Sequence, residues 1–116
     1  NSVKAMRACC WLKPQGLLEP FADAVFRAYW TDDRDIAQDA VLADIARAVG
    51  VDAAAMLAAI ATPELKAQLK AYTDEAIARG AFGSPTIFVG GDDLYFGNDR
   101  LPLVRAAVLR RRAAAA

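Results

Sequence analysis

The amino-acid sequence predicts an α/β fold that is mostly helical, with one β-hairpin and a final helix. Apolar residues recur at helical spacing through roughly the first eighty residues, and only short polar connections separate these segments. Two short apolar runs, at 86–89 and 94–96, flank the sequence Gly-Gly-Asp-Asp, which is typical of a hairpin turn. A last amphipathic segment begins around Asp99.

Residues 1–12 predict a first helix that buries Val3, Met6 and Cys10 on one face, with Asn1 or Ser2 as its N-cap. The sequence Lys-Pro-Gln-Gly at 13–16 ends this helix. A second helix either begins near Glu19 or bends there, at Pro20, and it carries a wide apolar face that we expect to be buried. The members of this face are Leu17, Leu18, Phe21, Val25, Phe26, Tyr29 and Trp30.

Capping signals divide the middle of the chain into three further helices. Asp35, followed three residues later by Gln38, resembles a capping box and predicts a helix start at this point. Asp52 predicts the start of a short Ala-rich helix that ends near residue 61. Thr62 precedes a proline at the first helical position and predicts a long helix to residue 79, which Gly80 stops.

Composition excludes several classes of function. Lys and Arg number 14, as do Asp and Glu, so no excess of positive charge favours a nucleic-acid partner. The chain has no histidine, and its only cysteines, Cys9 and Cys10, are adjacent and lack CxxC spacing. We therefore predict no metal site and two buried thiols that pack as small apolar groups. No stretch predicts a membrane partner or a signal peptide, and we expect a cytoplasmic location.

The hairpin itself carries an expectation about its surroundings. A lone two-stranded hairpin is only marginally stable in water, and the runs TIFV and LYF are more apolar than a half-exposed hairpin requires. We therefore expect these strands to belong to a larger sheet whose other strands precede Asn1.

Polar residues at the two ends of the hairpin are candidates for a binding site. A cis bond before Pro85 would turn the N–H and C=O of Ser84 outward, where an extended ligand could pair with them. Because only about 5–6% of X–Pro bonds are cis in folded proteins, the local sequence favours trans. Asp99 predicts an N-cap of the last helix. Asn98 and Asp99 could also bind the carboxylate and ammonium groups of an amino-acid ligand at this helix start.

The stretch "RGAFGSPTIFVGGDDLYFGNDRL" closely resembles the end of the 2-hydroxychromene-2-carboxylate isomerases and of the related kappa-class glutathione transferases. The segments "NSVKAMRA", "AYWTDDRDI" and "IATPELKAQLKAYTDEAIARGAFGSPT" extend the similarity over nearly the whole chain. The combination GxxGxPT…FGxDR at this spacing is fairly specific. The resemblance implies a thioredoxin-like fold with a DsbA-like helical insertion, of which this chain would be the C-terminal part.

That resemblance assigns a domain and a role to each candidate. Residues 1–79 would form the helical insertion and a connecting helix, 80–112 the hairpin and final helix, and 113–116 a tail. Pro85 would be a cis proline, Ser84 would pair with the cysteinyl part of glutathione, and Asn98 and Asp99 would hold its γ-glutamyl end. Asn1 would face the substrate. The serine that stabilises the thiolate in this family is expected upstream of Asn1, so no catalytic residue is assigned here.

The implied function is a glutathione-dependent isomerase that acts on a small aromatic substrate by reversible thiol addition and elimination, with glutathione as cofactor. Trp11, Phe26 and Trp30 could cover such a substrate, although as isolated aromatics each is better interpreted as core. A kappa-class-like transferase, a DsbA-like thiol–disulfide oxidoreductase with a CxxC upstream, and a non-catalytic helical interaction module remain alternatives. A homodimer also remains open.

Overall fold

The computed structural model describes all 116 residues and contains six α-helices, two 3₁₀ helices and one two-stranded antiparallel sheet. The chain forms two compact units, Asn1–Tyr72 (the helical unit) and Thr73–Ala116 (the hairpin unit). The functional division at residues 79 and 80 stays a prediction. None of the helices combines the length and the apolar character that a membrane crossing requires.

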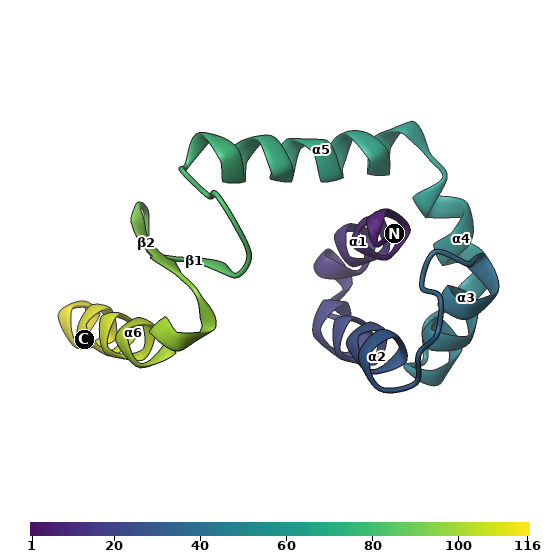
Figure 1. Ribbon diagram of the computed structural model, residues 1–116. Coiled ribbons are helices and arrows are strands. Elements are labelled where there is room, and N and C mark those ends of the chain that lie inside the picture. Colours follow the sequence, from purple (N-terminus) through teal and green to yellow (C-terminus); the bar gives the residue numbers. More distant parts are fainter. The chain divides into compact units, whose positions relative to one another are not determined.

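The helical unit is built from four helices and the first part of a fifth. They are α1 (Val3–Leu12), α2 (Leu18–Trp30), α3 (Asp39–Ala48) and α4 (Ala53–Ile60), with the 3₁₀ helix η1 (Lys13–Gln15) between the first two. As Figure 1 shows, α1 packs against both α2 and α4, and α3 packs against the same two helices. Each of these helices therefore buries a face against two neighbours.

The core of the helical unit lies between these four helices. Its largest fully buried side chains are Phe21, Leu12, Leu42 and Met56. They come from four different helices, so the core ties the whole unit together. No charged or polar side chain is buried in it, and its stability therefore rests on apolar burial.

The predicted buried face of α1 was wrong. The buried residues of α1 are Ala5, Ala8 and Leu12. Met6, which was expected inside, is 42% exposed. Because α1 packs against two helices at once, small alanine side chains at its contacts let the backbones approach closely, and the bulkier residues turn outward.

Capping signals were correct for α4 and α5 but not for α3. Asp52 accepts a hydrogen bond from the backbone N–H of Ala55 (3.0 Å) and starts α4 as predicted. Thr62 accepts one from the N–H of Leu65 (3.3 Å) at the start of α5 (Pro63–Ala78). Asp35 instead closes a local turn, accepting from the N–H of Ala37 at 3.0 Å, and α3 begins only at Asp39. Asp often prefers such short-range bonds to a helical cap.

The hairpin unit contains a two-stranded sheet and the last helix of the chain. Strands β1 (Thr86–Val89) and β2 (Asp93–Phe96) pair antiparallel, with Thr86 opposite Phe96. The 3₁₀ helix η2 (Asn98–Arg100) leads into α6 (Leu101–Ala115), which packs on β1. The buried residues of this unit are Val89 and Ala107. Helix α6 also includes most of the segment that was expected to be a tail.

Candidate functional site

The open end of the hairpin brings together the four site residues that the sequence placed there. Ser84 and Pro85 lead into β1, and Asn98 and Asp99 follow β2. The backbone N–H of Gly97 donates to the carbonyl of Pro85 (3.0 Å), which extends the pairing of Thr86 with Phe96 by one residue. Ser84 precedes Pro85 and Asn98 follows Gly97, so the two residues flank this last bond at the open end of the hairpin. Antiparallel pairing is thus the reason that residues fourteen positions apart share one site.

The peptide bond between Ser84 and Pro85 is cis. The expectation of a trans bond, which rested on local base rates, was therefore wrong, and the cis form implied by the family resemblance is confirmed.

The loop before β1 leaves the backbone of Ser84 unpaired. Neither its N–H nor its C=O hydrogen-bonds to another backbone group, and the residue is exposed. The loop itself is held by its neighbours: the hydroxyl of Thr86 donates to the carbonyl of Gly83 at 2.5 Å. A Cβ at Gly83 would lie only 2.7 Å from the Phe96 ring, so glycine is needed for this close packing. Ser84 therefore offers one donor and one acceptor to an extended ligand.

Asn98 and Asp99 supply the polar groups on the other side of the site. Asp99 was expected to cap the last helix, but the N-caps of η2 and α6 are Gly97 and Arg100, and neither helix has a side-chain cap bond. The backbone N–H groups of Asn98 and Asp99 also donate to no other backbone group. Because both lie at the start of η2, which continues into α6, these donors are available to an anionic group.

Asn1, the fifth predicted site residue, belongs to the helical unit. Its side-chain oxygen accepts a hydrogen bond from the N–H of Val3 (2.9 Å). It stands at one end of a groove of about 430 Å³ between the start of α1 and the outer face of α2, which we call the aromatic groove. The residues that line this groove are Asn1, Ser2, Ala5, Met6, Cys9, Ala22, Val25, Phe26, Tyr29, Trp30 and Ile36.

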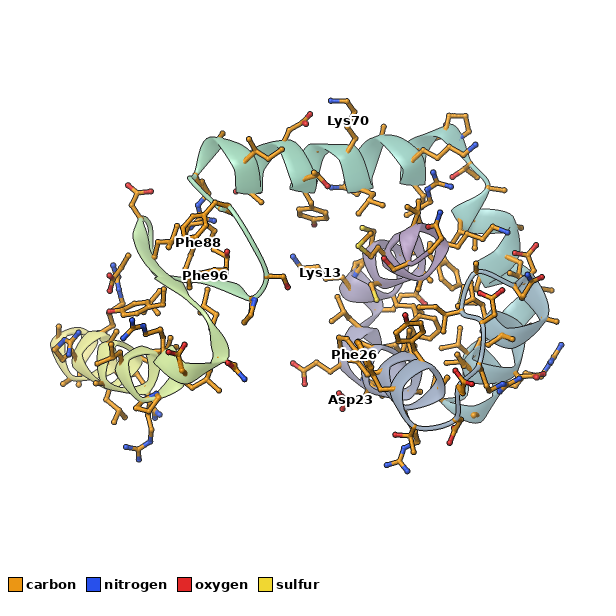
Figure 2. All side chains as sticks on the ribbon, viewed as in Figure 1. Lys13, Asp23, Phe26, Lys70, Phe88 and Phe96 are labelled. Carbon is orange, nitrogen blue, oxygen red and sulfur yellow. The ribbon has the colours of Figure 1, made fainter.

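Large aromatic side chains dominate the aromatic groove. Phe26 is 62% exposed and Trp30 is 76% exposed, so the interpretation of both as core residues was wrong. Figure 2 shows Phe26 projecting from α2. Tyr29 and Trp30 meet edge to face, with ring centroids 4.8 Å apart. Trp11, in contrast, packs partly buried against the core. The groove thus presents flat apolar surface, with polar atoms of Asn1 and Ser2 at one end.

Cys9 and Cys10 are free and half-buried, and their environment makes them poor nucleophiles. Burial raises the pKa of the Cys9 thiol, and the neighbouring Cys10 raises it further. Burial also raises the pKa of the Cys10 thiol, although Lys13 acts in the opposite direction. Since the thiolate is the reactive form, a raised pKa lowers reactivity near neutral pH.

We accordingly expect both cysteines to react with iodoacetamide more slowly than free glutathione does at about pH 7. Their rates should rise only at a higher pH than that of an ordinary thiol. Mass spectrometry of tryptic peptides after timed alkylation would measure each rate separately. A cysteine that is alkylated faster than glutathione near neutral pH would contradict this assignment.

The family of the chain is shown by its match to a family model. A scan of family models matches the DSBA-like thioredoxin domain over residues 1–109. The chain therefore belongs to the family of DSBA-like thioredoxin domains, as the sequence predicted.

Curated relatives fall into two groups. The chain is 29% identical over 102 residues to 2-hydroxychromene-2-carboxylate isomerase of Sphingobium xenophagum, a match that covers 88% of this chain and 52% of the relative. It is 32% identical over 112 residues to glutathione S-transferase kappa 1 of Homo sapiens, covering 90% and 50%. A further 2-hydroxychromene-2-carboxylate isomerase, from Pseudomonas sp. strain C18, is 32% identical over 88 residues, covering 76% and 41%. The chain thus spans about half the length of the relatives it matches.

Sequence reasoning missed three residues that shape the hairpin unit. Gly83 permits the packing on Phe96, Arg79 contacts the hairpin turn, and the guanidinium of Arg111 fills the space beside Gly90. The glycine spacing was visible in the sequence, but a close approach between a glycine and an aromatic ring is set by tertiary packing. The two arginines gave no signal, because Arg111 belongs to the basic run 110–112 and Arg79 stands near a helix end, where arginine side chains are usually solvated.

Proposed function

We propose that this chain forms the glutathione-binding hairpin and the substrate-covering helices of a glutathione-dependent isomerase that acts on 2-hydroxychromene-2-carboxylate-type aromatic substrates. One observation carries the proposal: the open end of the hairpin gathers an unpaired backbone donor and acceptor at Ser84 with the uncommitted polar groups of Asn98 and Asp99. The names of the relatives, two isomerases and a glutathione transferase, agree with such a site.

The residues at this site fit the chemistry of glutathione. Its backbone amides can pair with Ser84 as an added strand does with a sheet edge. Its γ-glutamyl carboxylate suits the backbone N–H groups of Asn98 and Asp99 and the side-chain amide of Asn98. Its ammonium group suits the carboxylate of Asp99, which is exposed and caps neither helix. Both charged groups of the γ-glutamyl end of the ligand thus have a complementary group.

When bound, glutathione supplies a thiol that adds reversibly to a conjugated carbon of the substrate and leaves unchanged after a single bond has rotated. The part of this chain is to bind and orient. Ser84, Asn98 and Asp99 fix the backbone of the cofactor. No residue of this chain is assigned to hold the thiolate, and neither Ser2 nor Ser84 is given that role.

The aromatic groove is the proposed cover for the substrate. Phe26, Tyr29 and Trp30 offer flat apolar surfaces that suit a fused aromatic ring, and Asn1 offers an amide to a polar substituent. Wide exposure of these rings in the helical unit agrees with a role in binding. The homodimer and the cytoplasmic location stay predictions.

A kappa-class-like transferase is the second candidate, since the human kappa enzyme matches this chain at 32% identity. The same hairpin site would serve that reaction, and the two differ in whether glutathione is consumed. The oxidoreductase alternative finds no support in Cys9 and Cys10, whose raised pKa disfavours thiol exchange. A non-catalytic module would leave the groups at the open end of the hairpin without a ligand.

We predict that Asp99→Ala in the full-length protein raises the Kd for glutathione at least about fivefold, which is about 1 kcal/mol. The substitution removes the acceptor for the ammonium group. It should leave the fold intact, because Asp99 makes no cap bond. Isothermal titration calorimetry with glutathione measures the change.

Asp92→Ala is the matched control, because Asp92 is an exposed carboxylate in the same hairpin but at its turn. Its Kd should equal that of the unsubstituted protein. An Asp99→Ala variant with unaltered affinity would remove Asp99 from the site.

A further inference from the structure

Arg79 directly follows α5 and links three parts of the hairpin unit. Its guanidinium donates a hydrogen bond to the backbone carbonyl of Gly91 in the hairpin turn. The same group lies over the ring of Phe88 on β1, with 4.0 Å between the guanidinium carbon and the ring centroid. It also pairs with Glu75, one turn earlier on α5, at 3.8 Å. One side chain therefore joins the end of a helix to a strand and a turn.

These contacts of Arg79 hold together the two ends of the loop that carries Ser84. Residues 80–85 connect α5 to β1, so Arg79 stands at one end of the loop and Phe88 lies three residues beyond the other. A side chain that ties the two ends reduces the conformations that the loop can adopt. Because Ser84 has no backbone hydrogen bond of its own, its position depends on such ties.

Side-chain packing also fixes the interior of the 80–85 loop. Phe82 and Phe96 pack with ring centroids 4.6 Å apart, and Gly83 lies against the Phe96 ring. From the other helix, the guanidinium of Arg111 occupies the space beside Gly90 in the turn. The hairpin is thus held at its turn from both α5 and α6, while its open end carries the ligand groups.

We propose that Arg79 is a positioning residue for glutathione, which holds the 80–85 loop so that the N–H and C=O of Ser84 stay aligned with the backbone of the ligand. This inference rests on the proposed function for the identity of the ligand. The contacts of Arg79 with Gly91 and Phe88 themselves do not depend on it.

The test compares Arg79→Ala, Arg79→Lys and Arg105→Ala in the full-length protein. Arg79→Ala should raise the KM for glutathione at least about fivefold while kcat at saturating glutathione stays within about twofold, because a misplaced loop weakens binding without altering bound geometry. Arg79→Lys keeps a cation over Phe88 and a donor for Gly91, so it should recover most of the affinity. Arg105, an exposed arginine of α6, is the control and should change neither constant.

Amide exchange by NMR gives a readout that needs no ligand. The N–H of Gly97 donates to the carbonyl of Pro85, so its exchange rate reports whether the two chain segments stay paired at the open end of the hairpin. This N–H should exchange at least about tenfold faster in Arg79→Ala. The N–H of Val51, which donates to Ala46 in the helical unit, should not change.

The outcomes separate this inference from the function on which it rests. A wild-type KM for glutathione in Arg79→Ala, or a kcat that falls with the folded fraction and is not rescued by lysine, would overturn the positioning role. If the unsubstituted protein does not bind glutathione at all, the proposed function fails, and the exchange of Gly97 alone decides whether Arg79 holds the loop. Unchanged exchange there would overturn the inference as well.

Discussion

Replacing Phe21 with alanine is expected to lower the free energy of unfolding of the helical unit by about 3–5 kcal/mol. Phe21 is fully buried among side chains from α1, α3 and α4, so the substitution removes apolar burial and leaves a cavity that four packed helices cannot collapse to fill. A loss of this size is a large part of the 5–15 kcal/mol that typically stabilises a domain. Urea unfolding followed by far-ultraviolet circular dichroism measures it.

Phe26→Ala is the matched control, because it removes the same side chain from the same helix at a position that is 62% exposed. Its effect on unfolding should stay within about 0.5 kcal/mol. Since Phe26 lines the aromatic groove, this variant should instead raise the KM for an aromatic substrate. Equal destabilisation by the two substitutions would contradict the division of α2 into a core face and a groove face.

Replacing Gly97 with alanine is expected to weaken glutathione binding at least about tenfold and to cost about 1–3 kcal/mol of stability. Gly97 has φ +103° and ψ +148°, a conformation that is essentially restricted to glycine. A Cβ there would also lie 2.5 Å from a carboxylate oxygen of Asp99. The Asp99 carboxylate must move to relieve this clash, and the strain at φ +103° shifts the backbone that carries the donors at the start of η2.

Gly91→Ala serves as the control for Gly97→Ala within the same hairpin. Gly91 has no positive φ, and a Cβ there would meet no other atom within 4 Å. This variant should bind glutathione like the unsubstituted protein. Titration calorimetry and thermal unfolding of both variants make the comparison, and an unimpaired Gly97→Ala would show that the backbone at this point does not set the site.

Local patterns were enough to predict the hairpin and several helix boundaries. The two apolar runs around Gly-Gly-Asp-Asp became β1 and β2, because turn residues and short β-prone segments act over a few positions. Asp52 and Thr62 capped their helices for the same reason: each bond joins residues three apart. The grouping of Ser84 with Asn98 also followed once the strands were paired.

Features that depend on tertiary packing could not be predicted in this way. The cis bond before Pro85 was disfavoured by local base rates, and only the family resemblance indicated it. Asp99 looks like an N-cap in sequence, but the turn at Gly97 and the 3₁₀ start leave its side chain outside the helix end. On α1, the contact of three helices selected Ala5 and Ala8 over the more hydrophobic Met6.

The apolar face of α2 shows why the site was harder to predict than the fold. Periodicity marks Phe21, Phe26 and Trp30 alike, since it detects apolar spacing but not what covers each side chain. In the structure the core accommodates Phe21, while Phe26 and Trp30 extend the apolar face into a groove. The apolar face of α2 is wider than its contact with the core requires, and this extra width was the signal for a binding surface.

The fate of glutathione during turnover tests the central claim most directly. The full-length protein would be mixed with 2-hydroxychromene-2-carboxylate and glutathione, and both compounds would be followed together by NMR. We predict that the substrate isomerises only when glutathione is present and that the glutathione concentration stays constant throughout. Isomerisation at the same rate without glutathione, or accumulation of a glutathione conjugate in step with substrate loss, would contradict the proposed isomerase.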